Sequence, residues 1–157
     1  LIGMPGCGKS TVGAALAALT GQEAIDIDQR IEARAGCSIP EIFAQGGEAA
    51  FRALEREATA ACGALSGKLL LTGGGVVKTP ENYAALHQNG RIYQLLRPLE
   101  LLPTDGRPLS QGADLAAMWA ERAPLYERFR DAAIDNSGTV EQTAQAIWRD
   151  FCENSGH

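Results

Sequence analysis

The segment LIGMPGCGKST, residues 1–11, combines three glycines, one lysine and two hydroxyl side chains behind a short apolar start. Glycine loses more backbone entropy on folding than other residues, so Gly3, Gly6 and Gly8 indicate that backbone amides must approach a ligand closely. The spacing from Gly3 to Ser10 fits G-x-x-x-x-G-K-[ST], the pattern of a phosphate-binding loop (P-loop). The chemistry to expect is therefore nucleotide binding.

This loop predicts a role for each group in it. Backbone amides and the following helix N-terminus hold the phosphates, Lys9 reaches the β and γ oxygens, and the Ser10 hydroxyl holds Mg²⁺. ATP is favoured over GTP because the chain has no N-K-x-D-like sequence. Cys7 is interpreted as a small packed residue rather than a redox group. The expected nucleotide-binding residues are Gly3, Pro5, Gly6, Cys7, Gly8, Lys9, Ser10 and Thr11. The alternative is a glycine-rich turn that precedes an amphipathic helix by coincidence.

Two acids are the candidates for chemistry at the γ-phosphate. Asp26 and Asp28 are two residues apart in an expected strand, so both carboxylates should point to one side. One could hold Mg²⁺ through water, and the other could receive a proton from an attacking hydroxyl. Without the P-loop, the simpler interpretation would be two strand-end acids that begin a turn.

Two arginines and a triple glycine are ambiguous by themselves. Arg52 has Glu48 and Glu55 at helical spacing, which is typical of ordinary surface ion pairs, and Arg122 is one basic residue among several in a helical stretch. Gly73–Gly75 follow an apolar run and could form only a tight turn. However, ligands bind at the carboxyl ends of strands in open parallel sheets.

The apolar pattern alternates short β-like runs with helical stretches, which predicts an α/β fold with a parallel sheet covered on both faces. Ser38 with Glu41, and Thr139 with Gln142, resemble helix-capping pairs. The segment from Pro103 onward is rich in proline, glycine and small polar residues and predicts a mobile loop. Expected helices run from the P-loop to Thr20, from Ser38 to Gly46–Gly47, through Phe51–Ala58, from Thr79 to Asn89–Gly90, from about Asp114, and from Thr139 through Phe151. Expected strands cover 24–28, 68–72, 91–96 and 132–136.

Length and composition indicate one domain over residues 1–157. The net charge of −5, without a basic stripe, makes nucleic acid an unexpected partner. The four cysteines form no C-x-x-C pair, which disfavours a zinc site or a disulfide scaffold. No apolar run reaches the roughly 18 residues of a membrane helix. The chain starts at Leu1 with only a fragment of the strand that should precede the loop, so we expect a longer parent chain.

Six motifs occur in a characteristic order: GMPGCGKST, DID, FRALE, LLLTGGGVV, GRPLS and RAPLY. In this combination the chain resembles a shikimate kinase from the P-loop almost to the C-terminus. The resemblance implies a three-layer, nucleoside-monophosphate-kinase-like fold with a five-stranded parallel sheet flanked by helices. It also implies a mobile lid at about residues 103–114 and a substrate-binding region at about residues 28–62.

The resemblance implies phosphorylation of the 3-hydroxyl of shikimate by ATP with Mg²⁺, in aromatic amino-acid biosynthesis. Arg52 and Arg122 would hold the substrate carboxylate, and Asp28 would orient and deprotonate the hydroxyl. Gly73, Gly74 and Gly75 would line the other side. Asp26 would act on Mg²⁺ through water together with Ser10. Lys9 and the lid residue Arg107 would neutralise charge on the transferring group.

The chain departs from the family pattern around adenine. The segments on either side of GRPLS are shorter than the family usually has. Many members have an arginine ahead of the lid that stacks on adenine, but in this chain that stretch reads LELLPTD. Arg97 is a weak substitute. The closing strand ends at Asn136, where the family often has threonine, and residues 136–140 are expected to contact adenine.

Two other functions stay open on the sequence alone. One is another small-metabolite kinase, such as a gluconate kinase, since two arginines do not distinguish one hydroxy-carboxylate from another. The other is a non-catalytic ATP-binding module, although Lys9, Ser10, Asp26 and Asp28 are intact. We expect a monomeric, cytoplasmic enzyme without a membrane or nucleic-acid partner.

Overall fold

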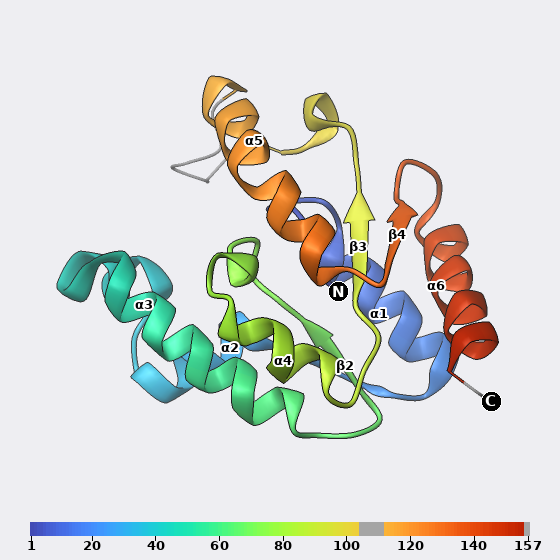
Figure 1. Ribbon diagram of the computed structural model, residues 1–157, viewed down its shortest axis with the longest axis horizontal. Helices are drawn as coiled ribbons and strands as arrows, with labels where there is room; N and C mark the ends of the chain where they lie inside the picture. The colour runs from blue at the N-terminus through green and yellow to red at the C-terminus, as the bar shows by residue number, and fades with distance from the viewer. Residues whose placement is uncertain (104–111, 156–157) are drawn as a thin grey trace.

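The computed structural model describes residues 1–103 and 112–155, and its helices and strands alternate along the chain except that two helices follow one another between the first two strands (Figure 1). None of the helices in these ranges combines the length and apolar character that a bilayer crossing requires. The helices are α1 (Lys9–Thr20), α2 (Ile27–Ala35), α3 (Ile39–Gly63), α4 (Glu81–His87), α5 (Gly112–Phe129) and α6 (Val140–Asn154), with 3₁₀ turns η1 (Val76–Lys78) and η2 (Leu99–Leu101). The strands are β1 (Glu23–Asp26), β2 (Lys68–Leu71), β3 (Tyr93–Leu96) and β4 (Ala132–Asp135).

The strands form two parallel pairs. Asp26 of β1 aligns with Leu71 of β2, and Leu96 of β3 aligns with Asp135 of β4. The first two residues of the chain connect the pairs, because Leu1 accepts from the Thr72 amide at 3.2 Å and Ile2 donates to the Tyr93 carbonyl at 2.9 Å. All these strands therefore end at one edge, where the P-loop begins.

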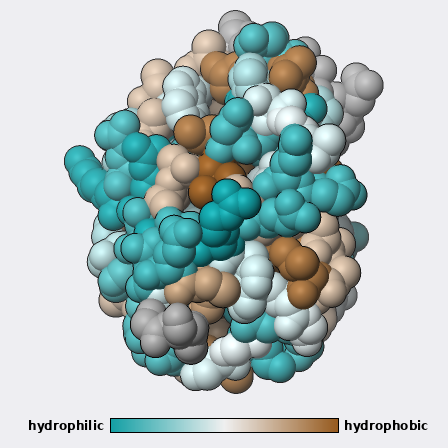
Figure 2. Space-filling model, turned by 90° about the vertical axis from the view of Figure 1, so that its right-hand side faces the viewer, coloured by the Kyte–Doolittle hydropathy of each residue, from teal (hydrophilic) through white to brown (hydrophobic). Residues whose placement is uncertain are grey.

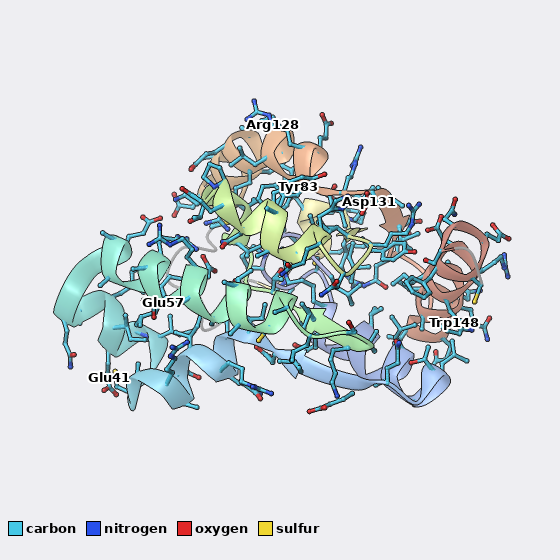
Figure 3. The ribbon with its side chains drawn as sticks, turned by 60° about the horizontal axis from the view of Figure 1, so that its bottom comes forward. Glu41, Glu57, Tyr83, Arg128, Asp131 and Trp148 are labelled. Atoms are coloured by element: carbon cyan, nitrogen blue, oxygen red, sulfur yellow. The ribbon has the colours of Figure 1, made fainter. Side chains whose placement is uncertain are left out.

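Helices pack in two groups around this sheet. α1 contacts α6, whereas α3 contacts both α2 and α4. Figure 3 shows Glu41 of α3 and Trp148 of α6 on opposite sides of the molecule. The buried side chains form one core, which includes Ile2, Val12, Ile25, Leu95 and Ile147. The α1–α6 group therefore supports the predicted nucleotide side, and the α2–α3 group lies at the predicted substrate region.

Several sequence predictions are confirmed. Ser38 accepts a bond from the Glu41 amide at the start of α3. The predicted break at Gly46–Gly47 occurs as a kink, with Gly47 at φ 72° inside α3. Thr139 and Gln142 form a reciprocal capping box, although α6 extends to Asn154 rather than ending at Phe151.

The prediction that Asp26 and Asp28 share a strand is wrong. β1 ends at Asp26, whose carboxylate accepts from the Gln29 amide at 3.2 Å and so caps α2. Asp28 consequently lies in the first turn of α2. The capping bond ends the strand two residues early, because an N-cap aspartate satisfies an amide that the new helix leaves open.

Candidate functional site

The P-loop follows the short Leu1–Ile2 strand segment and leads directly into α1. Gly6 and Gly8 have φ values of 79° and 102°, which only glycine adopts readily. Gly8 is the N-cap of α1 and provides no side-chain cap. The first amides of α1 are therefore available to an anion, as the sequence pattern predicts. Ser10 and Thr11 are exposed in this first turn.

Lys9 bends back over the same loop. Its ammonium donates to the Gly3 carbonyl at 2.7 Å and to the Met4 carbonyl at 3.1 Å. It also lies 3.7 Å from the Cys7 sulfur. Cys7 is only 1% exposed, which confirms its interpretation as a packed residue.

Asn136 has a role that the sequence analysis missed. Its amide donates to the Cys7 carbonyl at 2.7 Å, and its Oδ1 accepts from Thr143 at 2.7 Å. Arg97, considered above as an adenine contact, donates to the Asn136 carbonyl at 3.1 Å. No sequence pattern signals these long-range bonds.

Asp28 lies beside the triple glycine. Its Oδ1 is buried and has no hydrogen-bond partner in the part of the chain that the structure describes. Burial raises the pKa of this carboxyl, and the nearby Asp26 raises it further, while Lys9 partly opposes both. Such a group is a better proton acceptor than an exposed aspartate.

Arg52 is held by two glutamates of its own helix. Its Nη1 lies 2.9 Å from Glu55 Oε1, and its Nε lies 3.3 Å from Glu48 Oε1. Glu55 is not the surface partner that helical spacing suggested, because it is 1% exposed. Burial raises the Glu55 pKa, and the Arg52 charge counteracts this rise. Glu55 is thus a further site residue, and the spacing signalled the pairing but not the burial.

Arg122 of α5 is also buried, with 7% exposure. Its Nε has no hydrogen-bond partner within the described ranges. A buried guanidinium with an unused donor is suited to an anionic ligand.

The triple glycine brings these groups together. A Cβ at Gly73 would lie 2.9 Å from Asp28 Oδ1, and one at Gly74 would lie 2.7 Å from the Pro5 ring. A Cβ at Gly75 would collide with the Arg52 guanidinium. Glycine is required here because the loop backbone touches three site elements at once. The structure therefore places the P-loop, Asp28 and Arg52 around one loop.

Other predicted residues lie elsewhere or are not described. Arg107 and most of the predicted lid lie outside the described residues, and α5 already begins at Gly112. Two hollows of about 80 and 120 Å³ border Leu1, Lys68 and Arg91 at the amino ends of the strands. Both hollows lie away from the P-loop and do not mark the candidate site. The site is therefore assigned from the positions of its side chains.

Sequence comparison identifies the family. The family model described as shikimate kinase matches residues 5–152. A shikimate kinase of Synechococcus sp. (strain CC9605) is 40% identical over 156 residues, covering 94% of this chain and 78% of the relative. That of Halorhodospira halophila is 43% identical over 147 residues, covering 88% and 83%. These matches do not support the gluconate-kinase alternative.

Solved structures agree with the sequence matches. The shikimate kinase of Acinetobacter baumannii, solved in complex with shikimate, has a TM-score of 0.89 and 34% identity, covering 98% of this chain and 92% of that one. The Aquifex aeolicus shikimate kinase has a TM-score of 0.85 and 27% identity, covering 98% and 95%. The α/β fold is thus that of known shikimate kinases. The chain belongs to the shikimate kinase family and is a shikimate kinase enzyme.

Proposed function

We propose that this chain transfers the γ-phosphoryl group of ATP to the 3-hydroxyl of shikimate, with the P-loop and the Asp28–Arg52–Arg122 group as the two halves of its site. The observation that carries this assignment is the position of Gly73–Gly75, whose backbone packs against Pro5, Asp28 and Arg52. A substrate held there lies between a phosphate-binding loop and two guanidinium groups, the half-buried one of Arg52 and the buried one of Arg122. The shikimate bound in the A. baumannii relative supports the same ligand here.

Arg52 and Arg122 hold the shikimate carboxylate in this proposal. The unused Arg122 donor offers a charge-assisted bond, and the pairing of Arg52 with Glu55 fixes its guanidinium plane. A planar fork suits a carboxylate better than a lysine would. Backbone groups of Gly73–Gly75 then contact the hydroxyl side of the ring.

Asp28 accepts the proton of the reacting hydroxyl. The unpartnered Oδ1 provides the acceptor, and the raised pKa strengthens its basicity. Lys9 exchanges its bonds to Gly3 and Met4 for bonds to phosphate oxygens when ATP binds. Arg107, on the predicted lid, would add a second positive charge. Catalysis thus depends on positioning and electrostatics, without a covalent enzyme intermediate.

Mg²⁺ is compatible with the residues present. Magnesium prefers oxygen ligands and retains several waters, so it needs only one or two protein donors. The Ser10 hydroxyl is exposed at the start of α1, and the Asp26 carboxylate uses Oδ1 to cap α2. Ser10 directly and Asp26 through water would hold the ion. When bound, Mg²⁺ supplies positive charge to the phosphate oxygens.

The remaining assignments concern the whole molecule. Leu1–Ile2 are proposed as the end of a fifth, central strand, which would give the three-layer sheet order β1–β2–(Leu1–Ile2)–β3–β4. We propose a monomer, because the apolar residues on the face in Figure 2 lie in separate spots among hydrophilic ones. A cytoplasmic location is proposed because the chain belongs to the shikimate kinase family. The four exposed large hydrophobic residues of the described chain, Leu19, Leu65, Tyr83 and Leu101, come from different elements.

A coupled assay of ADP release tests the function. ATP and Mg²⁺ are supplied with shikimate, with gluconate, or with no acceptor. Turnover is expected with shikimate only, and the product should carry phosphate on the 3-hydroxyl by ³¹P NMR. Equal turnover with gluconate, or ATP hydrolysis that shikimate does not stimulate, would contradict the proposal.

A further inference from the structure

A buried tyrosine joins α5 to the triple-glycine loop. Tyr126 has 0% exposure, and its hydroxyl donates to the Gly74 carbonyl at 2.6 Å. The two residues are 52 positions apart. None of the roles assigned above uses this bond.

The acceptor of the bond is the middle residue of the loop that organises the site. Gly74 packs on Pro5 of the P-loop, while its neighbours pack on Asp28 and Arg52. The loop has no side chains with which to anchor itself. A displaced Gly74 carbonyl would therefore move the neighbouring glycines, which pack on Asp28 and Arg52 in the shikimate half of the site.

The donor of the bond, Tyr126, lies on the same helix as Arg122. Tyr126 follows Arg122 by four residues on α5, so both side chains lie on the same face of the helix. Burial raises the Tyr126 pKa, and the positive charge of Arg122 is the largest opposing influence. The Trp119 ring, centred 6.3 Å from that of Tyr126, packs nearby on the same helix. Tyr126 thus links α5, the helix that carries Arg122, to the glycine loop.

We propose that Tyr126 is a positioning residue whose hydroxyl fixes the distance between Arg122 and the Gly73–Gly75 loop. This separation must match the fixed span of shikimate from its carboxylate to its reacting hydroxyl, which is how the bond affects substrate binding. The proposal rests on the assignment of Arg122 to the substrate carboxylate. In this proposal Tyr126 acts through the Gly74 carbonyl and not through a contact with the substrate.

The test compares Tyr126→Phe with Tyr93→Phe in the full chain. Tyr93 is a matched control, because it is 4% exposed and its hydroxyl donates to Asp150 at 2.7 Å, far from the glycine loop. Each substitution removes one buried phenol bond. Tyr126→Phe should raise the KM for shikimate roughly tenfold, with the KM for ATP within about twofold of the parent. Tyr93→Phe should lower the melting temperature and leave both KM values unchanged.

The ATP KM and circular dichroism, measured on the same samples, confirm that the variants are folded. An unchanged shikimate KM in Tyr126→Phe, or the same increase in Tyr93→Phe, would overturn the proposal.

A double-mutant cycle separates this proposal from the function on which it rests. If Tyr126 acts through Arg122, its substitution should change kcat/KM for shikimate little in an Arg122→Ala background. A full tenfold effect there would overturn the proposal. If Arg122→Ala alone leaves shikimate binding intact, the assignment of Arg122 is wrong, and so is the proposal. If Arg122→Ala weakens binding but Tyr126→Phe does not, only the proposal is wrong.

Discussion

The side-chain nitrogen of Asn136 lies 2.7 Å from the backbone oxygen of Cys7, although 129 positions separate the two residues. The other amide atom of Asn136 accepts from Thr143 of α6. Asn136 is 3% exposed, and a Cβ on Gly8 would collide with its amide. The end of β4 and the first turns of α6 therefore hold the P-loop backbone.

Asn136→Ala should weaken ATP binding because it leaves the Cys7 carbonyl without its amide donor. A buried polar group without a partner typically costs about 1–3 kcal/mol, part of which should appear as a roughly fivefold increase in the KM for ATP. The KM for shikimate should stay within about twofold. Steady-state kinetics with each substrate varied in turn measures both values.

Asn82→Ala provides the matched control. Asn82 is also fully buried, and its amide donates to the Val76 carbonyl at 2.9 Å, beyond the glycine loop. This variant should lose comparable stability without an increase in the KM for ATP. If both variants raise that KM equally, Asn136 contributes only general stability.

Arg52→Ala should affect substrate binding and folding together. Removing one partner of a buried charge pair costs about 2–5 kcal/mol, which corresponds to a loss of shikimate affinity of roughly 30-fold or more. The variant also leaves the buried Glu55 carboxylate without the positive charge that lowers its pKa. The melting temperature at pH 7 should therefore fall, and Glu55→Gln in the same chain should restore much of it.

Arg91→Ala is the control for a lost arginine. Arg91 pairs with Asp150 at 2.7 Å near the C-terminus of the chain. It should lower stability by about 1 kcal/mol and leave shikimate affinity unchanged. Isothermal titration measures the shikimate affinity of both variants. Equal affinities of Arg52→Ala and Arg91→Ala would contradict the assignment of Arg52 to the substrate carboxylate.

Local patterns predicted most of the fold. Three features depend only on residues that are neighbours in the sequence, so local patterns can predict them. They are the P-loop, the Thr139 cap of α6 and the strand at Lys68–Leu71. Asp28 was placed in a strand because alternation cannot reveal that Asp26 would cap a helix instead. A single capping bond therefore decides whether this segment continues the strand or begins α2.

The long-range contacts that hold the site together could not be predicted from the sequence. The Asn136–Cys7 and Tyr126–Gly74 bonds join residues that are neighbours only after the sheet has formed. Helical spacing predicts a surface pair between Glu55 and Arg52, because it indicates the pairing but not the burial of Glu55. The motifs in the sequence are enough to name the site residues. The residues that hold them in place can be identified only from the folded structure.

Lys9→Ala should abolish most phosphoryl transfer without unfolding the protein. The ammonium donates to the Gly3 and Met4 carbonyls of the loop, so its loss should remove positive charge from the phosphate site more than core packing. We expect kcat to fall by about 10³-fold or more. Lys68→Ala, which breaks an exposed pair with Glu23, is the control and should keep normal turnover. Near-normal turnover in Lys9→Ala would contradict the P-loop assignment.

Asp28→Asn should lose turnover and gain stability at neutral pH. An amide can hold the substrate hydroxyl but cannot take its proton. In the folded parent the Asp28 pKa is raised above its ordinary value of 3.8, mainly by burial, so the charged carboxylate is unfavourable there. An acid of this kind stabilises the fold below its unfolded pKa and loses that stabilisation as the pH rises through its folded pKa.

The melting-temperature advantage of Asp28→Asn should therefore be present at pH 7 and shrink as the pH falls through the raised pKa toward 3.8. The parent's kcat should fall over the same window, because only the deprotonated carboxylate accepts the proton. Asp150→Asn is a useful contrast, since Arg91 lowers the Asp150 pKa and its charged form stabilises the fold at pH 7. Thermal melts at several pH values distinguish the two. If Asp28→Asn is less stable than the parent at pH 7, burial does not disfavour the charged Asp28 carboxylate. If the variant retains the parent's rate, Asp28 is not the base.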